Sequence, residues 1–275
     1  MDIDTYCSRI GYGGPRTPKL EVLQALALRH PQAIPFENVS VVAGGVPDLS
    51  IDALQAKLVR GGRGGYCYEQ NSLLQSALIE IGFTVTGLSA RVRYRLPPDL
   101  EVPRSHMVLC VDMPEGRFLV DAGFGGLTLT SPVMMDRHEP QSTSHETVRL
   151  VPAGSDQLLQ ARIAGQWVDV YRFDLSPHLP ADYAMQNWHT ATRPNSLFGN
   201  NLVATRPVAG GRYALFNRTL TWRPLDGKPE RQTLQSSAEL RDALHKVFTI
   251  AVPESEFERV ADVSSRGQES NASFT

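Results

Sequence analysis

Cys67 has the setting most suited to chemistry, because a glycine-rich turn, Arg63-Gly64-Gly65-Tyr66, delivers it to the predicted start of a helix. The first turn of a helix carries unpaired N–H groups and the positive end of the macrodipole, which favour thiolate over thiol. Thiolate is the form that attacks acyl carbonyls, and the same N–H groups could hold a developing oxyanion. The alternative is a buried structural cysteine, since free cysteine is among the most buried residue types. Cys67 is therefore a candidate nucleophile.

A thiol nucleophile needs a base beside it, and seven histidines are available. His106 stands out because it begins a predicted strand over 105–112, which is followed by a turn at 114–116 and a returning strand that ends at Asp121. His106 and Asp121 are the candidate base and orienting acid, with an ordinary cross-strand polar pair as the alternative. The others are expected to be solvated or structural, in loops, near helix ends or in an irregular stretch: His30, His138, His145, His178, His189 and His245.

Whether His106 and Asp121 meet depends on the length of the hairpin loop between them. With a two-residue loop at 114–115, they are diagonal neighbours on the same face, and with a four-residue loop they face each other directly. A three-residue loop with Gly116 in a left-handed bulge would put them on opposite faces. An even loop is thus required for a triad in which Asp121 fixes the tautomer of His106 and His106 deprotonates Cys67.

The remaining cysteines are interpreted as inert. Cys7 and Cys110 have neither a glycine turn nor a matched histidine, and the three cysteines form no paired disulfide framework. No His or Cys pair stands at the spacing of zinc ligands, so no metal site is expected. Arg63 is interpreted as a residue that holds the loop, through carbonyls or a carboxylate such as Glu69, rather than as a phosphate ligand.

Helical periodicity in the first third of the chain predicts a helix over 17–30, with Thr17 as N-cap and Pro18 in the first helical position. A second helix is predicted to begin after residue 50, and a third to cover 67–81 with Gly82 as C-cap. From Phe83 the hydrophobic period becomes two, which predicts strands over 84–94, 105–112, 117–122 and 166–173. The polar segment 132–147 is expected to be a surface loop. Further strands are predicted over 202–208, 213–217 and 220–224, then a helix opened by Ser236-x-x-Glu239 and a frayed tail after about residue 264.

These elements predict an α+β fold with a cysteine-protease-like Cys-His-Asp core. A helical N-terminal bundle over 1–82 carries the nucleophile, and a β-barrel-like domain over 83–182 carries the histidine and the aspartate. An irregular linker over 183–206 leads to an α/β lid over 207–275 with a disordered tail.

The composition is that of a globular chain, with 275 residues, 41% apolar and 20% charged. The 27 basic and 29 acidic residues give a net charge of −2, which supplies no electrostatic footprint for nucleic acid. The start of the chain carries Asp2 and Asp4 without an apolar signal region, and no stretch approaches the roughly 18 apolar residues of a membrane span. We therefore expect a cytoplasmic protein without nucleic-acid or membrane partners.

Taken together, the motifs resemble those of the arylamine N-acetyltransferase family. The resemblance is carried by Arg-Gly-Gly-Tyr-Cys-x-Glu-x-Asn around Cys67, by Ser105-His106, and by Asp-Ala-Gly-Phe-Gly-Gly from Asp121. It extends to Tyr6-Cys7-Ser8-Arg9-Ile10-Gly11-Tyr12 and to Pro35-Phe36-Glu37-Asn38-Val39, and it is thin after about residue 150. The family's triad maps onto Cys67, His106 and Asp121 without substitution.

The resemblance implies a ping-pong acyltransferase of xenobiotic metabolism. Acetyl-CoA, the donor co-substrate, would acetylate Cys67, CoA would leave, and an aromatic amine, hydrazine or N-hydroxyarylamine would attack the thioester. Phe36 and Phe124 resemble the family's aromatic wall around the acceptor, although both could be ordinary core residues.

For coenzyme A, the resemblance implies three kinds of contact. Gly123 and Gly125 lie in a glycine-rich loop that lets the backbone approach the pantetheine arm, although ordinary turns use the same residues. Ser105 stands where the family more often has threonine and would offer a hydroxyl. Phe198 resembles a coenzyme-contacting aromatic residue, with a plain hydrophobic anchor as the alternative.

Two other functions stay open at this point. A transglutaminase-like or papain-like amide hydrolase uses the same Cys-His-Asp chemistry, because water or an amine can resolve the same acyl-enzyme. A catalytically silent binding module that retained the fold is the second alternative, and the reactivity of Cys67 towards iodoacetamide would distinguish it.

Overall fold

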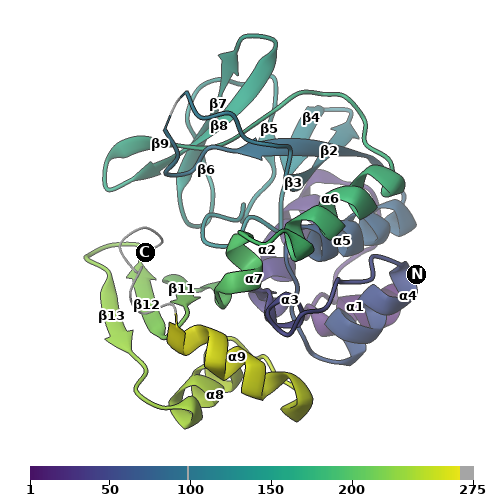
Figure 1. Ribbon diagram of the computed structural model, residues 1–275. Helices are drawn as coiled ribbons and strands as arrows, with labels where there is room; N and C mark the ends of the chain where they lie inside the picture. The colour runs from purple at the N-terminus through teal and green to yellow at the C-terminus, as the bar shows by residue number, and fades with distance from the viewer. Residues whose placement is uncertain (98, 267–275) are drawn as a thin grey trace.

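Helices make up most of the N-terminal part of the computed structural model, which describes residues 1–97 and 99–266 (Figure 1). They are α1 (Ile3–Arg9), α2 (Leu20–Ala33), α3 (Val39–Val42), α4 (Ile51–Leu54), the π-helix η1 (Gln55–Arg60) that continues it, and α5 (Cys67–Ile81). Helix α5 has the predicted bounds, and Gly82 caps it with a φ of 103°. Helix α2 begins later than predicted, because its N-cap is Lys19 and Thr17 and Pro18 lie outside the helix.

An eight-stranded antiparallel sheet forms the middle of the chain and curls into a barrel-like shape (Figure 1). Its strands are β2 (Thr84–Val92), β3 (His106–Met113), β4 (Gly116–Val120), β5 (Val133–Met134), β6 (Gln141–Ser142), β7 (Thr147–Ala153), β8 (Asp156–Ile163) and β9 (Gln166–Phe173). The order is β5-β4-β3-β2-β9-β8-β7-β6. The Gln141 side chain joins the two edges, since it accepts from Met134 N and donates to Met134 O, both at 2.9 Å.

The surface loop expected over 132–147 is wrong in part. Strands β5 and β6 lie inside it, and Gln141 makes the contact that nearly closes the barrel. A strand of two residues is too short to show a hydrophobic period, which is why the sequence pattern did not reveal either one.

Strands β2 to β4 separate two hydrophobic clusters. Side chains on one face fill the barrel with those of the other strands, among them Leu88, Val108, Leu119, Leu150, Leu159 and Val170. Side chains on the other face, such as Leu109 and Val111 of β3, pack in one cluster with Leu74 and Leu78 of α5. The helix that begins at Cys67 is therefore packed directly against the strand that begins at His106.

A second, five-stranded antiparallel sheet takes four strands from the C-terminal part of the chain and its first strand from the N-terminal part. Its order is β1 (Phe36–Glu37), β10 (Val203–Val208), β11 (Gly211–Phe216), β12 (Thr219–Pro224) and β13 (Glu230–Thr233). Helices α8 (Ser237–Lys246) and α9 (Glu254–Arg266) share its hydrophobic cluster. Ser236 caps α8 as predicted, because its hydroxyl accepts from Glu239 N at 3.1 Å. Neither β13 nor α9 was predicted.

The irregular conformation expected over 183–206 is wrong. Helices α6 (Pro180–Thr192) and α7 (Leu197–Asn200) occupy most of it, and β10 begins at Val203. Helix α6 buries only one narrow stripe of side chains, Tyr183, Asn187 and Thr190. Two of these three residues are polar, so the hydrophobic periodicity of the sequence could not reveal the helix.

The expected α+β class is confirmed by this arrangement of a helical part, a barrel-like sheet and a smaller α/β unit. The domain boundaries given above stay a prediction. Helix α9 continues through Ser264 and Ser265 to Arg266, beyond the point where fraying was expected, and residues 267–275 lie outside the described residues. Across 1–97 and 99–266, no helix has a long enough apolar run to cross a bilayer.

Candidate active site

The nucleophile turn, residues 63–66, lies against strand β1, and this contact fixes the start of α5. Glu37 N donates to Gly65 O at 3.1 Å, and Gly65 N donates to Pro35 O at 3.3 Å. Gly64 has no room for a side chain, since a Cβ there would lie 2.1 Å from Pro35 O. Cys67 follows as the first residue of α5 and is 3% exposed. The thiol therefore lies at a helix N-terminus, beside the unpaired backbone N–H groups of the first helical turn.

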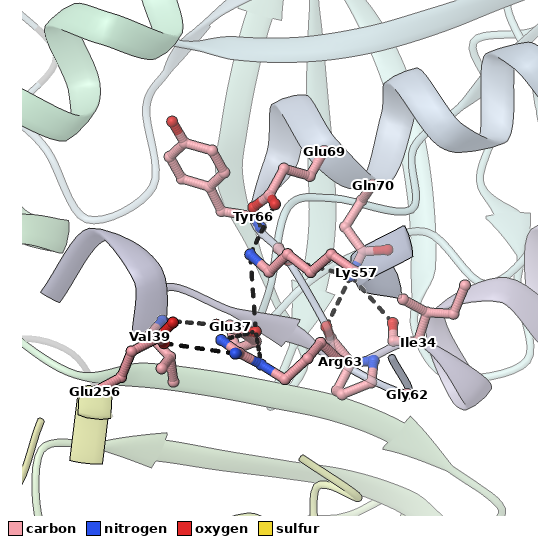
Figure 2. A network of polar contacts seen from close by, with 12 residues as sticks. Ile34, Glu37, Val39, Lys57, Gly62, Arg63, Tyr66, Glu69, Gln70 and Glu256 are labelled. Atoms are coloured by element: carbon pink, nitrogen blue, oxygen red, sulfur yellow. Dashed lines mark hydrogen bonds and ion pairs between the residues drawn. The ribbon is translucent and has the colours of Figure 1, made fainter. Parts of the chain in front are cut away.

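A charged cluster of Glu37, Lys57, Arg63 and Glu69 surrounds the turn, with Lys57 between the two glutamates, as Figure 2 shows. Lys57 Nζ lies 2.7 Å from Glu69 Oε1 and 4.0 Å from Glu37 Oε1, and Arg63 Nη2 lies 3.0 Å from Glu37 Oε1. Burial disfavours a charged Glu37, but Lys57 and Arg63 outweigh it and hold the pKa of this carboxyl below its usual range. Arg63 thus holds the loop through a carboxylate, which is Glu37 rather than Glu69.

The hairpin between β3 and β4 has the two-residue turn that brings His106 and Asp121 to one face. Met113 faces Gly116 and Leu109 faces Val120, so the loop consists of residues 114–115. His106 Nε2 lies 2.8 Å from Asp121 Oδ2, and neither side chain is more than 4% exposed. The odd loop that would have separated them is therefore excluded.

Asp121 is held by donors on both of its oxygens. Oδ1 accepts from Gly123 N at 2.8 Å and from Asn71 Nδ2 at 3.0 Å, while Oδ2 faces His106. Burial disfavours the ionised carboxyl, but His106 and these hydrogen bonds outweigh it and lower its pKa. Burial also disfavours the charged imidazole, yet the charge and hydrogen bond of Asp121, with a smaller contribution from nearby Cys67, raise the pKa of His106 to about 10. Because Nε2 of His106 faces Asp121, Nδ1 is the ring nitrogen that remains available to the Cys67 thiol.

A cavity of about 740 Å³ opens at the thiol. It is lined by every residue singled out from the sequence except Asp121, namely Cys67, His106, Phe36, Phe124, Ser105, Gly123, Gly125 and Phe198. Asp121 lies behind His106, away from the cavity, as an orienting group should. The structure thus gathers residues from α5, β1, β3, α7 and the loop after β4 at one site.

Aromatic rings form two parts of the cavity wall. The Phe124 ring stands edge-on to the His106 ring at 5.1 Å and contacts Tyr171 at 5.3 Å, measured between ring centroids. Phe36 contacts Phe198 at 5.7 Å. Both pairs place apolar surface where a flat ring could be buried.

Three residues of the site carry no local sequence signal that assigns them a role. Asn71 belongs to the quoted motif, yet only the structure shows it on Asp121. Tyr171 packs its ring on His106 at 5.1 Å, and Arg223 of β12 lines the cavity. Tyr171 and Arg223 could not be predicted because they are far from Cys67 in the sequence and reach the site only through the pairing of their strands.

Side chains outside the site fit the inert interpretation given to them. Cys7 and Cys110 are buried, and burial raises the pKa of both thiols, to about 11 for Cys110. His30 is buried with Tyr6 and Gln70 on its two ring nitrogens, so its role is structural. No group of three or more His, Cys, Asp or Glu side chains is placed to hold a metal ion in the part of the chain that the structure describes.

Comparison with known proteins identifies the family. A family model described as N-acetyltransferase matches residues 19–257, well past the point where the motif resemblance thins. An arylamine N-acetyltransferase of Mycolicibacterium smegmatis is 41% identical over 91% of this chain and 92% of its own. The chain belongs to the arylamine N-acetyltransferase family. The resemblance found in the motifs is confirmed, and the chain is an acyltransferase.

Solved structures of arylamine N-acetyltransferases share the fold. The structure of the Mycobacterium marinum arylamine N-acetyltransferase matches with a TM-score of 0.92 at 36% identity, covering 96% of this chain and 100% of that chain. The M. marinum arylamine N-acetyltransferase in complex with CoA matches with a TM-score of 0.91 at 35% identity, covering 95% and 99%.

Proposed function

We propose that this arylamine N-acetyltransferase moves the acetyl group of acetyl-CoA to aromatic amines, hydrazines or N-hydroxyarylamines through an acetyl-Cys67 intermediate. Cys67, His106 and Asp121 act as the triad. The observation that carries the proposal is that Cys67 and His106 share one cavity wall while Asp121 holds the ring from behind at 2.8 Å. This arrangement orients the imidazole and keeps it protonated beside a thiolate.

In the first half-reaction, the thiolate of Cys67 attacks the thioester carbonyl of acetyl-CoA and forms a tetrahedral oxyanion. Backbone N–H groups in the first turn of α5 point at this charge. The C–S bond to CoA then breaks, and His106 gives its proton to the leaving sulfur. The enzyme is left with acetyl-Cys67 and a neutral imidazole.

In the second half-reaction, the amine nitrogen attacks the carbonyl of acetyl-Cys67, and His106 takes the proton that the nitrogen loses. The bond to Cys67 Sγ breaks, which restores the thiolate and the protonated His106. A thioester is reactive enough to acetylate a weakly nucleophilic arylamine. We propose that Phe36 and Phe124 hold the aryl ring, because both line the cavity and Phe124 stands directly beside His106.

We propose that coenzyme A lies along the same cavity, where Ser105, Gly123, Gly125 and Phe198 contact it. A structure of the M. marinum relative contains CoA, which supports a CoA site in this chain. The charge of the cavity supports it further, since no described Asp or Glu lines the cavity whereas Arg193 and Arg223 do. Guanidinium groups are suited to the phosphates of the coenzyme.

Arg223 is the less exposed of these two arginines. Arg223 lies opposite Arg212 in the neighbouring strand. Arg212 forms an ion pair with Glu146 at 2.6 Å, whereas Arg223 has no ion pair among the described residues. We expect Arg223→Met to raise the KM for acetyl-CoA about tenfold, because it removes one charged hydrogen-bonding group. S-acetylpantetheine, which lacks the nucleotide phosphates, should show no such change. Equal effects on both donors would contradict the role.

Acetyl-CoA without an acceptor gives the central test. We expect one acetyl group per chain, on Cys67, and a matching release of free CoA, with none on Cys67→Ala. The amide-hydrolase alternative predicts instead that peptides or simple amides acylate Cys67. The silent-module alternative predicts that iodoacetamide alkylates Cys67 no faster than a model thiol at neutral pH.

A further inference from the structure

Asn71 lies in α5 four residues after Cys67 and touches the carboxylate that holds His106. Its side chain is fully buried and makes three hydrogen bonds. Nδ2 donates to Met107 O at 2.7 Å and to Asp121 Oδ1 at 3.0 Å, and Oδ1 accepts from Ala122 N at 2.9 Å. One amide thus joins α5 to β3 and to the segment that follows β4.

These three bonds fix the distance between the nucleophile and its partners. Residues four apart lie on the same face of a helix, so Asn71 and Cys67 both face the hairpin of β3 and β4. Met107 is the neighbour of His106 in β3, and Ala122 is the neighbour of Asp121. A shift of α5 along the hairpin, which would move the thiol relative to the imidazole, would therefore break the Asn71 contacts.

Asn71 also acts on the charge of Asp121. An ionised carboxylate only accepts hydrogen bonds, and both protons of the Asn71 amide are donated, one of them to Asp121. Such donation stabilises the ionised carboxylate over the acid. A residue that merely filled the space between helix and hairpin would lack this effect.

We propose that Asn71 is a positioning residue of the reaction, which holds Asp121 ionised against His106 and sets the place of Cys67 relative to both. The inference rests on the proposed function, because it requires the triad to act. Asn71 is absent from the cavity wall, so it acts through the triad and not through substrate contact.

The test replaces the amide by an isosteric carboxyl group. Asn71→Asp puts two carboxyl groups side by side, and two such groups share a proton and titrate as a pair. We expect the rate of Cys67 alkylation by iodoacetamide to gain a step in its pH profile that the parent lacks. Asn217→Asp is the matched control, since Asn217 is equally buried but lies at the β11–β12 turn. Its profile should keep the parent's shape.

A second variant separates positioning from folding. Asn71→Ala should lower kcat about a hundredfold, the order expected for a small misplacement of reacting groups, with little change in the KM for acetyl-CoA. Thermal unfolding gives the folded fraction, and rates are compared per folded molecule. An Asn71→Asp profile that superimposes on the parent's, or an Asn71→Ala kcat equal to the parent's, would overturn the inference. If the parent itself forms no acetyl-Cys67, the proposed function has failed instead.

Discussion

Asp121 is the residue on which the proposed chemistry depends most, because it is buried and accepts hydrogen bonds from three different partners. Its role is to orient His106 and to stabilise the imidazolium, without taking the proton itself. A neutral amide in its place can fill the same space but offers the imidazole the wrong hydrogen-bonding partner.

We predict that Asp121→Asn lowers kcat by about 10⁴-fold, because the amide favours the wrong tautomer of His106 and supplies no charge. Steady-state acetylation of an arylamine at saturating acetyl-CoA measures the effect, and thermal unfolding serves as the folding control. A kcat within a few-fold of the parent's would show that the triad assignment is incorrect.

His30 gives a prediction about stability at low pH. Its ring nitrogens lie 2.8 Å from Tyr6 Oη and 2.7 Å from Gln70 Oε1. Burial lowers the pKa of His30 from 6.5 to about 4, so between these values the unfolded chain binds a proton that the folded chain does not. The free energy of unfolding therefore falls as the pH drops below 6.5. Below about pH 4 the folded chain also binds the proton, and His30 causes no further loss.

We predict that His30→Gln removes this part of the acid sensitivity. Over the same window, the parent should lose about 3 kcal/mol more of its unfolding free energy than the variant, at roughly 1.4 kcal/mol per pKa unit. Urea unfolding of both proteins at several pH values measures the difference. Parallel curves for parent and variant would mean that His30 is charged in the folded state.

At the scale of elements, the hairpin of β3 and β4 shows how far a sequence pattern reaches. The alternation of side chains reduced the question to whether the loop is odd or even, and the observed pairing is the even one. Helix α6 shows the limit, since its buried stripe includes polar Asn187 and Thr190, and Asn187 Nδ2 donates to Pro47 O, a partner far away in the sequence. A pattern of apolar residues cannot report burial of this kind.

The loop after β4 gives a prediction with a control inside the same loop. A Cβ at Gly123 would lie 2.7 Å from Cys67 Cα, whereas nothing lies within 4 Å of a Cβ built at Gly126. Gly123→Ala should therefore displace the start of α5, with a clear loss of Tm and of alkylation rate at Cys67. Gly126→Ala should leave Tm unchanged. Equal Tm values for the two variants would show that the loop is not packed against the helix as described.

At the scale of the whole molecule, the site is assembled by segments from both ends of the chain. Phe36 of β1 pairs with Thr205 of β10, and the same short strand bonds to the nucleophile turn at Gly65. Arg63 of the turn also lies 3.5 Å from Glu256 of α9 (Figure 2). The C-terminal sheet and helix therefore support the loop that presents Cys67.

The two carboxylates that contact Arg63, Glu37 inside the charged cluster and Glu256 outside it, should contribute unequally to stability. Glu37→Gln leaves buried Arg63 and half-buried Lys57 without a shared partner and should lower the free energy of unfolding by about 3–5 kcal/mol. Glu256 is partly exposed, so Glu256→Gln should cost about 1 kcal/mol or less. Urea titration of both variants measures this, and a larger loss for Glu256→Gln would reverse our account of the cluster.

The sequence by itself determined the local elements on which the chemistry depends. The glycine turn before Cys67, the bounds of α5 and the strand that begins at His106 follow from periodicity and capping, which act over a few neighbouring residues. Only the tertiary structure decided that Asn71 reaches Asp121, that Glu37 holds Arg63, and that Arg223 faces the cavity. These contacts join residues far apart along the chain, and such contacts arise from how whole elements pack, which no local pattern encodes.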